Sequence, residues 1–204
     1  MKKIKVLDFA IFILIVVAII IAILIIIRMK KNQETVETMA STVNIIENLQ
    51  QDLQQENTEE DFEETKQQLL ETTIQGHNIE GIIEIPSIGL KYPIINKTND
   101  ETMKISVTKF WGGTINEMGN YTIVGHNNLD GTMFGKVKKL QEGDIIKLTN
   151  LYGETIEYKI FDMYVIDPND VSCTKIVEEG TKEVTLITCT NGRKNRLVTK
   201  AREI

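Results

Sequence analysis

Two short motifs of this chain contain residue types that could carry nucleophilic catalysis. The first is EVTLITC at residues 183–189, a run rich in β-branched and apolar residues that predicts a buried strand ending at Cys189. A thiol at the end of a rigid strand is held in place, which suits a nucleophile. Asn191 and Gly192 then favour a turn, and Arg196 begins a second strand-like run. The pattern is therefore strand, cysteine, turn, arginine, strand.

The second motif is YTIVGHNN, in which His126 directly follows a predicted strand at residues 121–124. A cysteine nucleophile needs a base or cation nearby, because a free thiol titrates near pH 8.5 and is only about a few per cent ionised at neutral pH. The guanidinium of Arg196 stays protonated and is suited to stabilise a developing oxyanion. If the strand ends face one another, these residues would form a cysteine–histidine–arginine site.

Each of these residues also has a purely structural interpretation. A cysteine in an apolar strand is usually a small buried hydrophobe, which is how we interpret Cys173, and sequence does not decide whether the two cysteines pair. A lone histidine is more often structural than catalytic, and an arginine at a strand start is usually solvated. Arg193 lies nearer to Cys189 than Arg196 does. We favour Arg196 because strand packing would fix its backbone.

An uncharged apolar run at residues 9–27 predicts a transmembrane helix. At about 1.5 Å per residue it would span close to 30 Å, the thickness of a bilayer core. Arg28 and Lys30 follow the run in place of small residues, which disfavours a cleavable signal peptide. We therefore expect residues 1–31 to form a membrane anchor, although lysines and arginines on both flanks leave its orientation open.

Residues 32–78 form an acidic segment rich in Gln and Glu, which we interpret as a helical or flexible stalk. Val36, Met39, Val43 and Ile46 recur at helical spacing, so the first half predicts an amphipathic helix. The second half is nearly all polar, which favours a fraying helix or a solvated spacer. We interpret His77 as an ordinary linker histidine. This segment accounts for the net charge of -6, and the β-rich part at residues 79–204 lacks the basic face that nucleic-acid binding requires.

Residues 79–204 consist of short β-rich runs separated by turn signals, which predicts an all-β barrel or sandwich. Within it we expect a short helix at 100–110, a helical turn at 132–140 and a hairpin of strands at 144–149 and 154–167. About 125 residues are enough for a closed barrel with its own core.

Five stretches of this region resemble the sortases, membrane-anchored cysteine transpeptidases of Gram-positive bacteria. In chain order they are IPSIGLKYPII, IVGHNN, FGKVKKLQEGDIIKL, IDPNDVS and TLITC, the last followed by RLVTKAREI. The resemblance covers roughly residues 80–204. It implies a mainly β fold, an eight-stranded sortase-like barrel with short helices, preceded by an N-terminal transmembrane helix and a helical or flexible stalk.

The resemblance also implies roles for individual residues. Cys189 would be the nucleophile, His126 the general acid and base, and Arg196 the oxyanion-stabilising or substrate-orienting residue. The enzyme would cleave an LPXTG-like sorting signal between Thr and Gly through a thioester and transfer the protein to an amine of the cell wall. Its partners would be secreted proteins with such C-terminal signals, a peptidoglycan precursor or other amine acceptor, and the lipid bilayer.

The same resemblance implies a single-pass membrane protein with a cytoplasmic N-terminus and an extracellular catalytic domain. We expect no cofactor; the calcium site of some class A sortases has no assignable counterpart here, and calcium activation stays open. The short connection between residues 167 and 183 disfavours class B, and the lack of a second apolar span and of an Asp-Pro-aromatic lid disfavours class C.

Two other functions stay open. One is a cell-wall cysteine peptidase or amidase, although papain-like enzymes place the cysteine before the histidine, whereas His126 precedes Cys189 here. The other is a catalytically inactive, membrane-anchored binding barrel.

Overall fold

The computed structural model describes residues 2–55 and 58–204, and the chain divides into two compact units between Glu37 and Thr38. Helix α1 (Lys2–Gln55) supplies most of the first unit and begins the second. In the first unit the apolar side chains of residues 9–27 are exposed. By length and composition this helix is able to cross a membrane.

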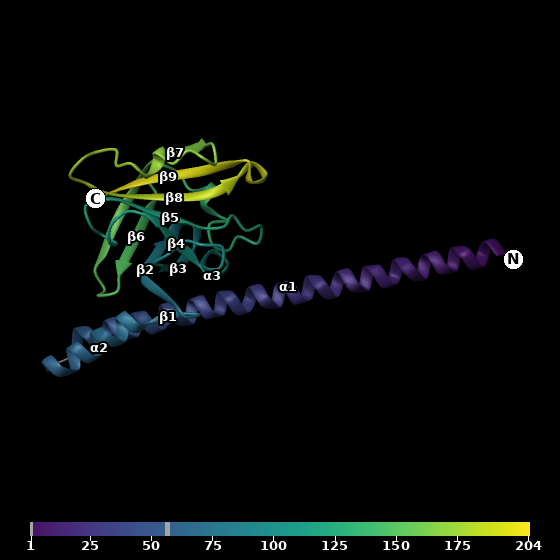
Figure 1. The fold of residues 1–204 in the computed structure, drawn as a ribbon, viewed down its shortest axis with the longest axis horizontal. Helices are drawn as coiled ribbons and strands as arrows, with labels where there is room; N and C mark the ends of the chain where they lie inside the picture. Colours follow the sequence, from purple (N-terminus) through teal and green to yellow (C-terminus); the bar gives the residue numbers. More distant parts are fainter. Residues whose placement is uncertain (1, 56–57) are drawn as a thin grey trace. The chain divides into compact units, whose positions relative to one another are not determined.

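The second unit contains a closed β-barrel (Figure 1). Its strands are β1 (Thr73–Ile74), β2 (His77–Ile85), β3 (Leu90–Ile95), β4 (Val107–Trp111), β5 (Gly119–Val124), β6 (Ile145–Asn150), β7 (Thr155–Ile166), β8 (Lys182–Thr190) and β9 (Asn195–Glu203). Its helices are the end of α1, α2 (Glu59–Glu71), α3 (Thr102–Ile105) and four 3₁₀ turns, η1 (Pro86–Ile88), η2 (Val137–Lys139), η3 (Ser172–Thr174) and η4 (Asn191–Arg193).

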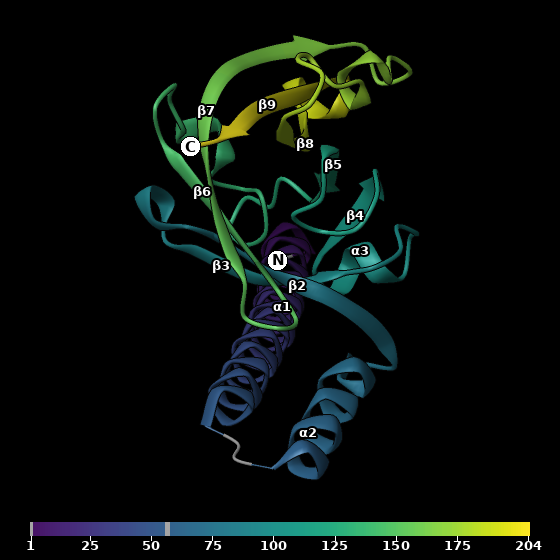
Figure 2. The same cartoon turned by 90° about the vertical axis from the view of Figure 1, so that its left-hand side faces the viewer.

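Strands β2 to β9 form an eight-stranded barrel, which confirms the predicted fold. The order is β2-β3-β4-β5-β8-β9-β7-β6, and pairing of β2 with β6 closes the ring. The run from β6 through β7, β9, β8 and β5 to β4 can be followed around the barrel in Figure 2. Most neighbours are antiparallel, but β3–β4 and β5–β8 are parallel pairs. The parallel β5–β8 pair matters most here because its carboxyl ends carry His126 and Cys189.

The barrel interior is filled by the inward-facing residues of these strands together with Phe134, Val137 and Leu140 from the connection after β5. Alternation of buried and exposed side chains is the expected result of a strand that faces the core on one side. The predicted helical turn at 132–140 is shorter than expected, since only Val137–Lys139 is helical, in 3₁₀ form. Likewise the helix expected at 100–110 is confined to Thr102–Ile105, because Val107–Trp111 pairs with β5 as a strand.

The acidic segment packs against the barrel instead of standing clear of it. Met39, Val43 and Ile46 of α1 are buried in a hydrophobic cluster that also contains Leu69 of α2 and Leu151 of the barrel. The predicted amphipathic helix is therefore present. Its apolar face is covered by α2 and the barrel. Burial of this apolar area is what stabilises the contact.

Polar contacts fix where α1 meets the barrel. The Gln50 side-chain amide donates to the carbonyls of Asn150 (2.9 Å) and Leu151 (3.2 Å) in the turn between β6 and β7. The Lys91 ammonium on β3 lies 2.6 Å from the Glu47 carboxylate. The polar run after α1 forms a second helix because Thr58 caps α2 by accepting from the Asp61 amide (3.2 Å), and acidic residues occupy its first turn.

The histidine expected in the linker belongs to the domain instead. His77 begins β2, and its Nε2 lies 3.9 Å from a carboxylate oxygen of Glu101.

Candidate active site

Cys189 and His126 lie side by side because β5 and β8 are parallel and in register. The register pairs Val124 with Ile187. The pairing continues past the end of β5, where the Gly125 amide donates to the Ile187 carbonyl (3.2 Å) and the Thr188 hydroxyl donates to the Gly125 carbonyl (2.7 Å). The next residues are His126, just beyond the end of β5, and Cys189 on β8, and both line the same cavity.

Arg196 lies on the other side of Cys189. The antiparallel register of β8 and β9 places Cys189 directly opposite Arg196, where Cβ atoms are typically about 5 Å apart. Three neighbouring strands thus deliver histidine, cysteine and arginine to one row at the end of the barrel. The residues are separated by as many as 70 positions in sequence, and the sheet register alone brings them together.

All three side chains line one cavity of about 370 Å³. Each is half-buried. The other lining residues are Thr98, Met103, Phe110, Val124, Gly125, Pro168, Asp170, Val171, Ile187 and Thr188. The walls are mainly apolar, and His126 and Arg196 flank Cys189. This composition suits an extended peptide with apolar side chains and a scissile amide placed at the thiol.

Backbone contacts hold His126 in place. The Phe134 amide donates to the His126 carbonyl (3.0 Å), and the Asn127 side-chain amide donates to the Cys189 carbonyl (2.7 Å). Gly125 allows the close packing behind them, since a Cβ there would lie 2.9 Å from atoms of Phe134 and Val107. Sequence reasoning missed the bridging role of Asn127; its position directly after the histidine was the available signal.

The electrostatic surroundings favour neutral His126. Burial lowers the pKa of its imidazole, the positive charges of Arg193 and Lys104 lower it further, and Asp100 acts in the opposite direction. A neutral imidazole at the end of β5 is suited to accept a proton from a thiol. Formation of a thiolate beside it would then favour the imidazolium through their mutual attraction.

The two candidate arginines occupy different places. Arg196 lines the cavity, and its Nη1 donates to the carbonyls of Arg193 (3.2 Å) and Asn195 (3.2 Å). Arg193 is exposed in the η4 turn, where its φ of 73° lies in the left-handed region, and it is absent from the residues that line the cavity. Arg193 therefore acts on the site through its charge on His126 and through the carbonyl that orients Arg196.

The second cysteine is placed apart from this row. Cys173 is 2% exposed and packs with Val124, Ile187 and Val198. Burial and the nearby Asp170 raise the pKa of its thiol, so it stays protonated. Both cysteines are free. The structure thus supports the interpretation of Cys173 as a buried hydrophobe and provides no disulfide.

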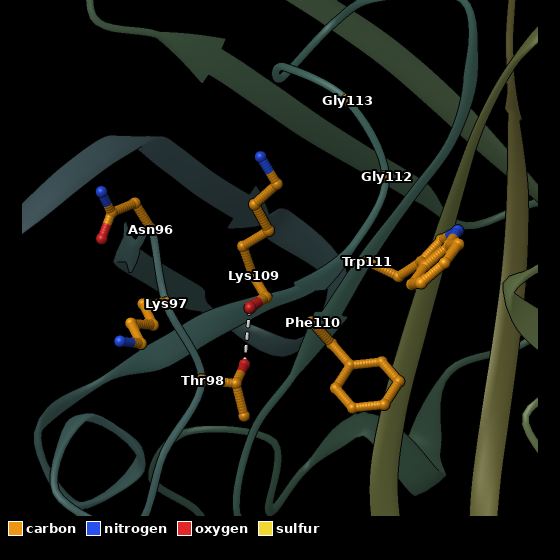
Figure 3. A pocket seen from close by; sticks show the side chains of 8 residues that line it. All are labelled: Asn96, Lys97, Thr98, Lys109, Phe110, Trp111, Gly112 and Gly113. Carbon is orange, nitrogen blue, oxygen red and sulfur yellow. Dashed lines mark hydrogen bonds between the residues drawn. The ribbon is translucent and has the colours of Figure 1, made fainter.

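The loop between β7 and β8 forms a wall of the cavity through Pro168, Asp170 and Val171. The sequence placed these residues in a family-like stretch but did not indicate that they face the cysteine. A second cavity, of about 690 Å³, is lined by the end of β4 and by residues 96–98 after β3. In Figure 3 Lys109 points to the side of the strand opposite Phe110, and the Thr98 hydroxyl donates to the Lys109 carbonyl (2.5 Å). Thr98 and Phe110 border both cavities.

Within residues 2–55 and 58–204, no group of three or more His, Cys, Asp or Glu side chains is arranged to hold a metal ion. A thiol with an adjacent imidazole and a guanidinium is a set of groups suited to acyl transfer from an amide through a covalent intermediate.

Comparison with known proteins agrees with this fold. Residues 83–204 match the sortase domain family. The chain is 32% identical over 114 residues to a sortase A of Listeria monocytogenes, covering 54% of this chain and 49% of that protein. It is 26% identical over 130 residues to a sortase A of Bacillus anthracis, covering 63% of this chain and 60% of that protein.

The structural similarity extends further along the chain. A Clostridium perfringens sortase D5 transpeptidase superposes with a TM-score of 0.65 and 27% identity, covering 82% of this chain and 99% of the other. The chain spans about half to three fifths of the two sortase A proteins. It is a small β-barrel protein with a cysteine–histidine–arginine cavity. It belongs to the sortase family.

Proposed function

We propose that this protein is a membrane-anchored sortase transpeptidase that uses Cys189 as nucleophile. The observation that carries the proposal is the row of His126, Cys189 and Arg196 on neighbouring strands, lining one cavity. Family membership supports it, as do the transpeptidase and sortase A relatives. No other thiol has access to this cavity, because Cys173 is buried beneath its wall.

The proposed reaction has two acyl-transfer steps. In the first, His126 accepts the proton of the Cys189 thiol, and the thiolate attacks the carbonyl carbon of the Thr–Gly amide in an LPXTG-like signal. Arg196 stabilises the tetrahedral oxyanion. The imidazolium then gives its proton to the departing glycine nitrogen, the C–N bond breaks, and a thioester remains on Cys189.

In the second step an amine attacks the thioester carbonyl. Neutral His126 accepts the proton of this amine, and the carbon–sulfur bond breaks. A new amide is released while the Cys189 thiolate and the imidazolium are restored. Side chains of the protein supply every group that these steps use, so we expect the reaction to need no cofactor.

The proposed substrates follow from the cavity and the family. Val124, Ile187, Pro168 and Val171 offer apolar walls for the leucine and proline of an LPXTG-like signal. The proteins carrying it would be secreted proteins with C-terminal sorting signals. The acceptor would be an amine of a peptidoglycan precursor or a similar cell-wall component.

The location follows from the same function. We propose that residues 9–27 cross the cell membrane once, with residues 1–31 as the anchor and residues 79–204 as the catalytic barrel. The segment at 32–78 would join them, with its helices held against the barrel. Cell-wall substrates require the barrel outside the cell and the N-terminus inside. Protease treatment of intact cells should therefore digest the barrel; its full protection would contradict this orientation.

The test uses the full chain in detergent with a fluorogenic LPXTG-type peptide and an amine acceptor. Cys189→Ala should abolish turnover, and Cys173→Ala, the matched thiol control, should retain it. Arg196→Ala should lower kcat by about a hundred- to a thousandfold, the usual effect of losing an oxyanion donor. Formation of the peptide–amine product distinguishes a transpeptidase from a peptidase or amidase. Full turnover by Cys189→Ala would end the proposal.

A further inference from the structure

A buried group of charged and polar side chains lies toward the start of β8, at the other end of this strand from Cys189, and takes no part in the catalytic row. Glu183 on β8 and Lys200 on β9 have side chains that are 0% and 3% exposed, and their charged atoms lie 3.4 Å apart. Arg202 adds a second cation, 3.1 Å from the other Glu183 oxygen. Burying such charges is costly unless their hydrogen bonds are satisfied. The partners that satisfy them therefore indicate what the group does.

One set of partners is the backbone of the loop between β7 and β8. The Lys200 ammonium donates to the carbonyls of Lys175 (2.8 Å) and Cys173 (3.4 Å). The side-chain amide of Asn120, on β5, donates to the carbonyls of Cys173 (3.0 Å) and Thr174 (2.9 Å). Two buried side chains from different strands thus hold the carbonyls of the same short turn.

The amides of the loop are held in the same way. The carboxylate of Glu183 accepts from the amides of Val177 (2.9 Å) and Glu178 (3.1 Å). Arg202 lies 2.7 Å from the Glu178 carboxylate and so reaches the same part of the loop. We call Asn120, Glu183, Lys200 and Arg202 the loop-anchor cluster. These side chains of β5, β8 and β9 form hydrogen bonds and ion pairs with residues 173–178 of the loop.

The fastened loop is a wall of the peptide cavity. Pro168, Asp170 and Val171 line the cavity a few residues before the anchored turn. The Cys173 side chain packs against Val124 and Ile187, which line the same cavity from the barrel. A shift of the anchored turn would therefore move the wall relative to the strands that carry His126 and Cys189.

We propose that the loop-anchor cluster positions the β7–β8 loop as the peptide-binding wall of the cavity and thereby sets the affinity for the sorting peptide. This inference rests on the proposed function. Its members are positioning residues, since none of them lines the cavity. Another ion pair between strands serves as a comparison, because it does not contact the β7–β8 loop. Lys147 and Glu157, 2.7 Å apart, link β6 to β7 in the hairpin, away from the cavity-lining residues.

Lys200→Met tests the inference with the full chain. The variant removes both contacts to the loop carbonyls, while Arg202 and two amides still compensate Glu183. The KM for the LPXTG-type peptide should rise about tenfold, because the wall is in its binding position less often once these charged hydrogen bonds to the loop are lost, with kcat within about twofold of the parent. Lys147→Met is the matched control and should leave both constants unchanged.

A second measurement follows the loop without using activity. In a Cys189→Ala background Cys173 is the only thiol. Its alkylation should be about tenfold faster with Lys200→Met, because local opening exposes the thiol and removes the burial that raises its pKa. Lys147→Met should label at the parent rate. If Lys200→Met does not fold, Asn120→Ala removes contacts to the same carbonyls without leaving a charge unpaired, and the same readouts decide.

If Cys173 is alkylated in a folded Lys200→Met variant at the same rate as in the parent, the cluster does not hold the loop in place. If Cys173 is alkylated faster but the KM for the peptide is unchanged, the position of the loop does not set the affinity for the peptide. If the parent itself shows no turnover, the proposed function fails, and the labelling rates still decide whether the cluster holds the loop.

Discussion

Replacing Ile46 with alanine tests whether the helical segment after Glu37 belongs to the folded domain. Ile46 is 0% exposed in the cluster shared by α1, α2 and the barrel, whereas its neighbour Ile45 is 52% exposed. The two residues are of the same type and adjacent in the same helix but face different ways, so Ile45→Ala is a matched control. Truncating a fully buried isoleucine to alanine typically lowers the free energy of unfolding by about 2–5 kcal/mol. Truncating an exposed isoleucine changes it by less than about 0.5 kcal/mol.

The expected change in melting temperature follows from these values. For a unit of this size each kcal/mol shifts the Tm by about 2–4 °C. Ile46→Ala should therefore lower the Tm by about 4–20 °C, and Ile45→Ala by less than about 2 °C. Near-UV circular dichroism of the full chain in detergent is the suitable readout, because helix α1 of the first unit dominates the far-UV signal. Equal, small shifts for both variants would show that the segment is a solvated stalk and would refute the packing argument.

Two other substitutions probe the site. Arg193→Gln removes a positive charge that lowers the pKa of His126, so this pKa should rise; NMR titration in a Cys189→Ala background measures it, with the His77 signal as internal reference and Lys194→Gln as control. A fall or no change would contradict the assigned cause. Gly125→Ala should lower kcat by at least about tenfold, because the new methyl group displaces Phe134, which holds the His126 carbonyl, and small misplacements are costly in catalysis. Parental kcat in this variant would contradict the role of that packing.

Much of the fold followed from local patterns. The β-rich runs after residue 79 predicted a barrel, and the apolar run at 9–27 predicted a helix long enough to cross a membrane; the structure contains both. The heptad-like spacing of Met39, Val43 and Ile46 likewise predicted an amphipathic helix. Periodicity succeeds in such cases because it reports the near neighbours of each residue, which decide between helix and strand.

Other features could not be predicted because they depend on contacts between distant parts of the chain. What covers the apolar face of α1 depends on barrel residues such as Leu151, about a hundred positions away. The wall formed by Pro168 and Val171 depends on buried charges on β8 and β9 that hold the loop. The hydrophobic pattern of α1 does not indicate that Leu151 will cover it, and the pattern of the loop does not indicate which buried charges will hold it.

The site shows the same division. The sequence by itself determined that a thiol, an imidazole and a guanidinium stand at or just beyond strand ends, and its motifs identified the family. Only the tertiary structure decided that these ends are neighbours. The parallel register of β5 with β8 places His126 beside Cys189, and the antiparallel register of β8 with β9 places Arg196 opposite. The same registers leave Arg193 in an exposed turn. The turn between β8 and β9 constrains the register of that hairpin, but the pairing of β5 with β8, which are distant in sequence, depends on packing across the barrel.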